Sequence, residues 1–581
     1  MQRYHYGMLA LLGVLIAGAM VGLQPLAASM DSDYYYALGQ QIMQGRGDEQ
    51  PFIWNYLADP SEVPMPSFDY WMPLPAFVAA LGMWLTGTQA LWAARLPYIV
   101  LHGINTALVA YLIHRRTKQP HLAWLGGLSA SIPLFYASFI SFPESFTPLM
   151  TLGALYFLAV FEGDRLWAER LRIGYSIGVG ALCGLLHLTR ADGLIWLVAS
   201  ILLVGVAPWR ALDGQKFGFV VKIRIAVLNG LGLGIGYGLV VAPWVLHNVR
   251  AFGTVLQPGS GRVLWIREYN ELFFYPASVL TFARWAEQGW LNILKDRLWA
   301  LGQNLLSAIA VQGQIVLFPL IVLGCWKERH RLEVRFGMGM WALLGLVFSI
   351  LFPFAGVRGG FFHSGAALQP FLWMLGWWGF KHWMEWGVHK RGWKQELSQR
   401  VLGVGLLLIL LFTSASIYFR RVSGDNGAAP TWKVTQETYL AVHHKLLELG
   451  YEPENSLGAV NNPPTFFVLT GRSSIVIPGG DLSQLLAVLC RYGAKYVVLE
   501  RDQINLSLLY AHPTEIEALA YLGTVQGAHL LRLKDDAVTC RYFSQTGIDN
   551  YAILTPDLDT SEVDPGVRVA KGGDEHGDSG D

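Results

Sequence analysis

Long apolar segments recur along most of the chain and are separated by short polar segments. A helix needs about 20 apolar residues to cross the hydrocarbon core of a bilayer. Segments of this kind lie near 8–26, 92–113, 121–140, 144–162, 173–189, 191–207, 225–246, 299–325, 336–353, 363–380 and 401–419. The pattern predicts an α-helical integral membrane protein with about eleven transmembrane helices in residues 1–420.

One further apolar segment, 70–87, is predicted as a short helix along the outer membrane surface rather than a crossing, because it contains Pro73 and Pro75. Basic clusters mark cytoplasmic loops. Five of them share one side only if 70–87 does not cross: 115–118, 165–172, 210–224, 327–335 and 390–400. The prediction places the N-terminus in the cytoplasm. Two long loops, 27–91 and 248–298, and everything after Tyr418 then lie outside.

Residues 425–545 have the composition of a soluble domain. Segment 435–450 has helical periodicity and ends at Gly450, and segment 481–493 is predicted as a helix capped by Asp481. Three segments are predicted as short strands: 464–471, 473–480 and 494–500. We therefore expect a small extracytoplasmic α/β domain. The tail 555–581 is acidic and lacks apolar residues, which predicts disorder.

The composition excludes several classes of protein. The chain is 53% hydrophobic and 15% charged, whereas soluble domains carry about 25% charged residues. A net charge of +1 gives no electrostatic basis for nucleic-acid binding. Four cysteines are too few for a disulfide framework. Cys490 and Cys540 could pair with each other, or each could be a buried free thiol.

Acidic residues stand where the chain leaves the predicted membrane. Asp31 and Asp33 follow the first apolar segment in "DSDYYYA", and Glu144 lies in the turn "SFPES". Each could simply cap a helix. A carboxylate at the membrane surface could instead take a proton from an acceptor hydroxyl or amine. Asp31, Asp33 and Glu144 could also hold a divalent cation such as Mg or Mn.

Cationic residues are predicted on the same side of the membrane. They are Arg95, Arg190, Arg262, Arg358 and His363. Guanidinium groups bind phosphate oxygens in a fork, although Arg190 could also pair with Asp192, and single arginines often anchor at the lipid boundary. Acids and arginines together predict transfer from a lipid-phosphate donor. The acid would deprotonate the acceptor, the arginines would hold the phosphate, and a single displacement would invert the anomeric carbon.

In these features the chain resembles the GT-C superfamily of membrane glycosyltransferases, which includes protein O-mannosyltransferase-like enzymes and lipid A aminoarabinose transferases. The resemblance rests on the order of "DSDYYYA", "YWMPLPAFVAALGMWLTG", "AARLP", "FPESF", "GLLHLTRADGL" and "APWVLHNVRAFG". It implies a hexosyl- or pentosyltransferase with a polyprenyl-phosphate sugar donor, an inverting mechanism, and Asp31 or Asp33 as catalytic base. Glu144 matches the second acid. "WWDYG" does not occur, which argues against an oligosaccharyltransferase.

Two other classes of protein fit parts of the pattern. A transporter or flippase of lipid-linked sugars would use the same arginines, but it would also need ionisable residues near the middle of the membrane. A non-catalytic membrane scaffold would leave the acids without a role. We therefore expect a transferase whose partners are a polyprenyl-phosphate-linked sugar, an unidentified acceptor and the lipid bilayer, with no cofactor that the sequence makes certain.

Overall fold

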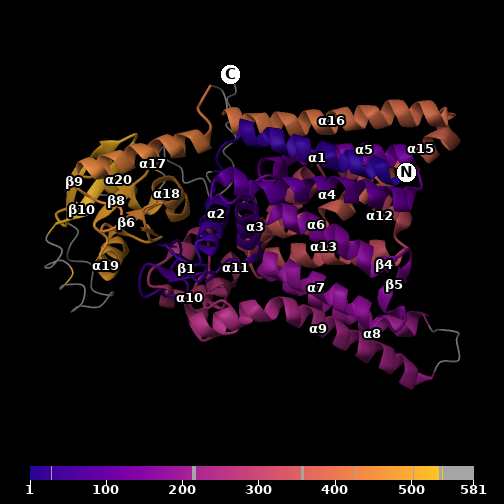
Figure 1. The fold of residues 1–581 in the computed structure, drawn as a ribbon, viewed down its shortest axis with the longest axis horizontal. Coiled ribbons are helices and arrows are strands. Elements are labelled where there is room, and N and C mark those ends of the chain that lie inside the picture. The colour runs from indigo at the N-terminus through magenta and orange to yellow at the C-terminus, as the bar shows by residue number, and fades with distance from the viewer. Residues whose placement is uncertain are drawn as a thin grey trace.

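Long helices run side by side through most of the structure (Figure 1), a computed structural model that describes residues 1–27, 29–211, 218–354, 359–424, 427–501, 503–534 and 540. The bundle contains α1 (Arg3–Leu23), α4 (Leu91–Thr117), α5 (Pro120–Ala130), α6 (Phe146–Val160), α7 (Ile173–Thr189), α8 (Leu194–Ala211), α9 (Phe219–Phe252), α11 (Trp290–Ser307), α12 (Phe318–Glu328), α13 (Leu332–Ile350), α15 (Gln369–Arg391) and α16 (Gln395–Ser423).

Six stretches among the described residues are helical, long and apolar enough to cross a membrane. They are α1, α4, α9, α13, α16 and Ala191–Arg210, which includes most of α8. The protein is therefore a multi-pass membrane protein, and each predicted apolar segment coincides with helical structure.

Several predicted crossings are not continuous α-helices; in the segment 363–380, for example, a 3₁₀-helix at Gly365–Leu368 precedes α15. In the segment 299–325, α11 ends at Ser307, a π-helical turn follows, and α12 begins at Phe318 with a proline in its first turn. Gln314 and Ile315 between them adopt positive φ angles, which a helix does not allow. In the segment 121–140, α5 ends at Ala130 and only a 3₁₀-helix, Leu134–Ser138, follows.

The apolar segment 70–87 forms the short helix α3 (Leu74–Thr86), with Pro75 in its first turn, where a missing N–H costs nothing. Its 13 residues are too few to span a bilayer. It packs against α2 (Met30–Met43) and α4. Both short helices lie at the end of the bundle that faces the C-terminal sheet (Figure 1).

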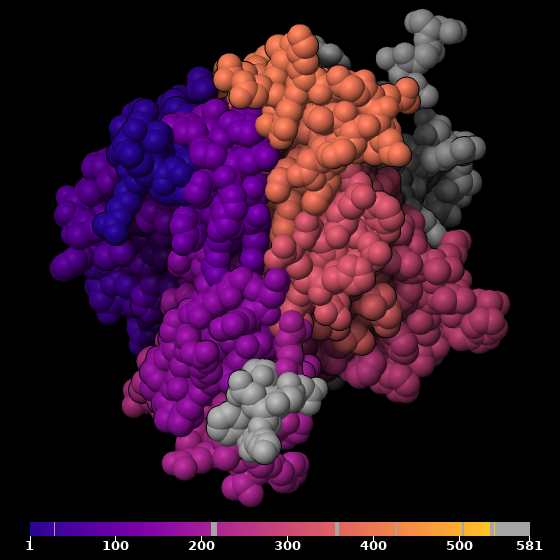
Figure 2. All heavy atoms as spheres, turned by 90° about the vertical axis from the view of Figure 1, so that its right-hand side faces the viewer, coloured from indigo at the N-terminus to yellow at the C-terminus, as the bar shows by residue number. Residues whose placement is uncertain are grey.

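The basic clusters gather at the opposite end of the bundle. Arg116 forms a buried ion pair with Glu333, and Arg331 lies 3.0 Å from Asp164. The N-terminal amine lies 2.9 Å from Nε2 of His114, at the end of α4. Figure 2 looks onto this end, where the indigo N-terminal segment lies beside the violet residues that follow it. These contacts support the prediction that the clusters share one side.

A six-stranded sheet lies beyond the other end, in the order β2-β7-β6-β8-β10-β9. β6 (Gly458–Val460), β7 (Ser474–Val476) and β8 (Tyr496–Leu499) are parallel, whereas β9 (Leu519–Val525) and β10 (Ala528–Leu533) form an antiparallel hairpin. The edge strand β2 (Phe52–Ile53) comes from the segment between α2 and α3 and pairs with β7. Residues outside 425–545 thus complete this sheet.

In the C-terminal region, capping residues mark where helices begin and end. α17 (Thr431–Glu448) is followed by Gly450 with a φ of 83°, and α19 (Leu482–Tyr492) begins at Asp481, which accepts a hydrogen bond from Ser483 N. Both helices are confirmed. The predicted strand 464–471 is wrong, because these residues form α18 (Pro463–Thr470). Asn462 caps this helix and two prolines occupy its first turn, which outweighs the short apolar run.

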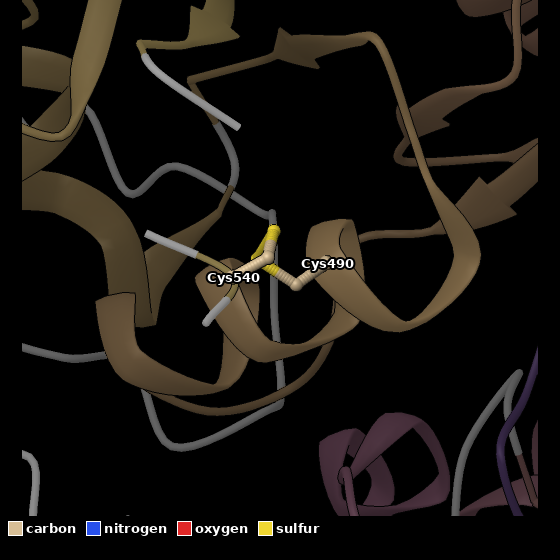
Figure 3. The surroundings of a disulfide bond; sticks show 2 residues. All are labelled: Cys490 and Cys540. Atoms are coloured by element: carbon tan, nitrogen blue, oxygen red, sulfur yellow. A yellow bond between two sulfur atoms is a disulfide. The ribbon is translucent and has the colours of Figure 1, made fainter. Parts of the chain in front are cut away.

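Cys490 of α19 and Cys540 form a disulfide (Figure 3), so of the two possibilities that the sequence left open they pair rather than remain free thiols. Cys183 and Cys325 are free. Arg358 and the tail 555–581 lie outside the described residues.

Contacts from the outer loops and α2 hold the sheet over the bundle. Beyond the β2–β7 pairing, the Tyr56 hydroxyl donates to Val476 O at 2.5 Å, and Gly479 N donates to Phe273 O at 2.9 Å. The Thr465 hydroxyl donates to the Asp33 carboxylate at 2.5 Å. The two long predicted outer loops therefore fill the space between bundle and sheet and fix their relative position.

Candidate active site

A cavity of about 1290 Å³ lies between the bundle end and the sheet. Within the described residues, the acidic, arginine and histidine side chains that line it on the bundle side are Asp31, Glu144, Arg190, Asp192, His363 and Arg421. They come from α2, from the turns that precede α6 and follow α7, from the short helix Gly360–Ser364, and from the end of α16. The fold thus brings together side chains that are far apart in the sequence.

The first turn of α2 separates the two aspartates. Residues at positions i and i+2 of a helix point in different directions. Asp31 lines the cavity, whereas Asp33 is 2% exposed and is bound by Thr465 of α18. Asp33 does not line the cavity, so the geometry favours Asp31 over Asp33 as a reacting group.

Glu144 lies beside Asp31 on the cavity wall and is 1% exposed. One carboxylate oxygen accepts hydrogen bonds from Ser145 N at 2.8 Å and from Ser145 Oγ at 3.0 Å, and the other accepts one from Ser32 Oγ at 3.4 Å. The His363 ring stacks on Phe146, with ring centroids 4.8 Å apart. One ligand atom each from Asp31, Glu144 and His363 lies within 4.8 Å of the others.

The surroundings of Asp31 and Glu144 give the two carboxyl groups different pKa values. Burial raises the pKa of Asp31 to about 6, and the nearby Arg190 limits the rise. Burial, with the Asp31 charge as a second cause, raises the pKa of Glu144 to about 8. At neutral pH Asp31 is therefore mostly a carboxylate and Glu144 mostly protonated. Environments that push two pKa values apart in this way indicate which group acts as base.

Arg190 and Arg421 are the arginines that line the cavity in the part of the chain that the structure describes. Arg190 Nε donates to Asp192 Oδ1 at 3.1 Å, so the expected pair with Asp192 forms within the cavity wall. Arg421, which the sequence reasoning missed, places its guanidinium over the Phe139 ring, 4.4 Å from the centroid. The missed signal is the basic pair Arg420 and Arg421 at the end of the last apolar segment, on the side where basic residues are not expected.

Arg95 and Arg262 do not line the cavity. Arg95 is 1% exposed and donates to the carbonyl oxygens of Gln24 and Ser141 at 2.9 and 3.0 Å, which joins the ends of neighbouring helices. Arg262 donates to Leu57 O at 2.5 Å and holds one outer loop against the other. Both guanidinium groups bind backbone carbonyl oxygens. Neither lines the cavity, as a residue that binds the donor phosphate there would have to.

Arg95→Ala is expected to destabilise the protein rather than weaken substrate binding. It leaves buried carbonyl groups without a charged donor, which costs on the order of 3 kcal/mol in the free energy of unfolding. Thermal unfolding in detergent, followed by intrinsic fluorescence, measures the loss. The control is Arg532→Ala, whose side chain is exposed on β10. Equal unfolding temperatures for both variants would contradict the role assigned to Arg95.

Asp33→Asn is expected to change the pH dependence of stability. Burial raises the pKa of Asp33 from 3.8 to about 7. Because the folded pKa lies above the unfolded one, the contribution of this group to stability is complete below about pH 4. It is lost as the pH rises through about 7. Between pH 5 and pH 8 the loss is about 3 kcal/mol.

The measurement for Asp33 is the unfolding free energy of wild type and Asp33→Asn at both pH values. Titration of all other groups cancels in the difference between the two proteins. The variant should gain on the wild type as the pH rises from 5 to 8. If the difference in unfolding free energy between the two proteins were the same at both pH values, Asp33 would not be a buried titrating group.

One part of the cavity wall is apolar and reaches the side of the bundle. It is formed by Leu194 and Val198 of α8 and by Leu343, Val347 and Leu351 of α13. Most of these side chains are exposed in the structure, where a membrane would surround them. The cavity therefore joins a polar, charged region to a surface that suits a lipid chain.

The fold is similar to that of known membrane glycosyltransferases. No protein-family model and no curated protein sequence matches the chain. The apo crystal structure of the oligosaccharyltransferase of Archaeoglobus fulgidus matches with a TM-score of 0.51 and 12% identity over 92% of this chain and 75% of that chain. A structure of the same enzyme with Zn and sulfate matches with a TM-score of 0.50 and 13% identity over 90% and 73%.

ArnT of Cupriavidus metallidurans bound to undecaprenyl phosphate also matches, with a TM-score of 0.50 and 12% identity over 91% of this chain and 98% of that chain. The chain thus has the fold of the GT-C membrane glycosyltransferases, as the resemblance implied. Identities this low establish the fold alone. What the protein does must be argued from the cavity.

Proposed function

We propose that the protein is a glycosyltransferase that moves a sugar from a polyprenyl-phosphate donor to an acceptor on the extracytoplasmic face of a membrane. One observation carries the proposal. A single cavity combines a carboxylate, two arginines and an apolar wall that opens to the side of the bundle. Undecaprenyl phosphate, which is bound in the similarly folded ArnT structure, has the phosphate and the lipid chain that such a cavity would hold.

The reaction needs one base and one displacement. The Asp31 carboxylate takes the proton from the acceptor hydroxyl, and the acceptor oxygen forms a bond to the anomeric carbon of the donor. The bond between that carbon and the phosphate oxygen breaks on the opposite face, so the configuration inverts. The electron pair leaves with the phosphate, and polyprenyl phosphate is the second product. The ionisation of Asp31 at neutral pH supports its assignment as the base.

Arg190 and Arg421 are the groups that hold the phosphate in this proposal. Asp192 orients Arg190 through a hydrogen bond at 3.1 Å, which reduces the side-chain freedom that binding would otherwise remove. Charge on the leaving phosphate grows as the glycosidic bond breaks, and fixed guanidinium groups stabilise that charge. The arginines thus serve both donor binding and departure of the phosphate.

Asp31, Glu144 and His363 fit a divalent cation, because their ligand atoms lie within 4.8 Å of one another. The sequence suggested Asp31, Asp33 and Glu144 as cation ligands, and the geometry puts His363 in the place of Asp33. An imidazole ligand suits Zn better than Mg or Mn, and Zn is present in one structure of the similarly folded oligosaccharyltransferase. A cation there would polarise an oxygen of the substrate as a Lewis acid. Glu144 would then lose the proton that burial favours.

Two observations support the extracytoplasmic orientation of the cavity. The basic clusters lie at the opposite end of the bundle, which the positive-inside rule assigns to the cytoplasm. The Cys490–Cys540 disulfide belongs to the part of the chain beside the cavity, and disulfides persist in oxidising compartments.

Native mass spectrometry of the purified protein tests the proposal. Wild type should retain polyprenyl phosphate or its sugar adduct, and Arg190→Ala should lose it. The mass of a retained adduct would identify the sugar. If wild type and variant carry the same ordinary phospholipids and nothing else, the phosphate site is refuted and a scaffold role is favoured. Retention with transport but no release of polyprenyl phosphate would favour a flippase.

A further inference from the structure

The parallel strands of the C-terminal sheet end at the cavity. β7, β6 and β8 run in the same direction, and the residues that follow their carboxyl ends line the cavity wall. These are Asn461 and Asn462 after β6, Ile477 and Gly479 after β7, and Glu500 after β8. In open α/β sheets, ligands bind in the crevice outside the carboxyl ends of the strands. The sheet is therefore oriented so that its binding edge faces Asp31.

The side chains along this edge are amides and a carboxylate. Glu500 is held by the Tyr439 hydroxyl, which donates to Oε1 at 2.8 Å and accepts from Asn462 N at 3.2 Å. Gln503 and Asn505 also line the cavity, and within the described residues no protein group bonds to their side chains. An amide both donates and accepts hydrogen bonds, which matches hydroxyl groups that do the same.

The charge on this wall favours an acceptor without negative charge. Among the described cavity residues that the sheet region contributes, after Thr431, none is a lysine or an arginine, and Glu500 is acidic. A phosphate or carboxylate bound beside Glu500 would be repelled in a site partly shielded from water. The cationic lining residues Arg190 and Arg421 belong to the bundle, where the donor phosphate is proposed to bind.

Flat aromatic surfaces complete the same cavity. Trp71 and Tyr70, in the segment between α2 and α3, are partly exposed and line the cavity, and Trp54, which is 1% exposed, is stacked on Trp71 with centroids 4.0 Å apart and an interplanar angle of 12°. The negative face of an aromatic ring attracts weakly positive C–H groups. A sugar ring presents such C–H groups on its faces and hydroxyl groups around its rim. Amides beside aromatic faces therefore suit a carbohydrate.

We propose that the carboxyl ends of β6, β7 and β8 form the acceptor site, and that the acceptor is a neutral carbohydrate chain. This inference rests on the proposed function. The amides and Glu500 bind hydroxyl groups of the chain, and the aromatic residues lie against its ring faces. One hydroxyl then reaches Asp31 on the bundle side of the cavity and receives the sugar.

Binding of the full-length protein in detergent to an array of neutral glycans, peptides and anionic lipids tests this site directly. Wild type should bind at least one neutral glycan, and that glycan becomes the titration probe. Gln503→Ala and Asn505→Ala should each raise its Kd at least about tenfold, since each removes hydrogen bonds to hydroxyl groups. The matched control is Asn455→Ala, an exposed asparagine of the same region that lies outside the cavity lining.

Different results would overturn the carbohydrate acceptor site and the glycosyltransferase activity. Binding to peptides or anionic lipids alone, no binding to any neutral glycan, or an unchanged Kd in both variants would each overturn the carbohydrate acceptor site. Release of polyprenyl phosphate from donor without acceptor, by slow hydrolysis, should be equal in wild type and the control Asn455→Ala. A protein that binds the glycan but never releases polyprenyl phosphate would refute the transferase and leave the glycan site standing.

Discussion

Asp31→Asn is expected to lower kcat for sugar transfer about a thousandfold, the usual contribution of a positioned general base. The amide keeps the size of the side chain but cannot take the proton of the acceptor hydroxyl. Asp31 is the one of the two neighbouring aspartates that lines the cavity, and although burial raises its pKa, the nearby Arg190 limits the rise to about 6, below neutral pH. Donor binding should change little, because the phosphate contacts are made by arginines.

The measurement for Asp31 is steady-state transfer from a radiolabelled polyprenyl-phosphate sugar, with donor binding measured in parallel. Asp33→Asn is the matched control: the same substitution two residues away on the same helix, at a side chain bound to Thr465. It should transfer at nearly the wild-type rate. Equal losses in both variants, or full activity in Asp31→Asn, would remove Asp31 from the role of base.

Arg190→Ala is expected to lower kcat/KM for the donor about a hundredfold, the cost of losing one fixed donor to a charged transition state. Most of the loss should come from weaker phosphate binding. Because the substitution also leaves Asp192 without its partner, the double variant Arg190→Ala with Asp192→Asn separates the two effects. If Arg190 binds phosphate, the double variant is as impaired as the single one.

Titration with polyprenyl phosphate measures this directly. Arg262→Ala is the control, because Arg262 binds the Leu57 carbonyl oxygen and does not line the cavity. Recovery of donor affinity in the double variant would mean that the uncompensated Asp192 charge caused the loss. Arg190 would then be a structural partner of Asp192 and nothing more.

Local patterns predicted much of the fold. Apolar runs located the helices, and capping residues such as Asp481 located helix boundaries in the C-terminal region. The failures have physical causes. The run that forms α18 is short and apolar, and such runs do not distinguish strand from helix. Pairing of β2 with β7 joins residues more than 400 positions apart in the chain, and no local pattern encodes it.

The candidate site was predicted less completely than the fold. Asp31, Glu144, Arg190 and His363 do share one cavity. Arg95 is predicted on the same side of the membrane as Arg190, and only tertiary contacts show that it binds backbone carbonyl groups instead. Asp33 could have been separated from Asp31 by recognising that a helix begins at Met30, because residues two apart on a helix point in different directions.

The central claim is that this cavity cleaves a polyprenyl-phosphate sugar. The most direct measurement is release of free polyprenyl phosphate when the purified protein is given that donor with a membrane extract as the source of acceptors. We predict release that follows loss of the donor one for one, and that falls to background in Asp31→Asn but not in Asp33→Asn. Donor that stays intact with wild-type protein, while still bound, would contradict the claim.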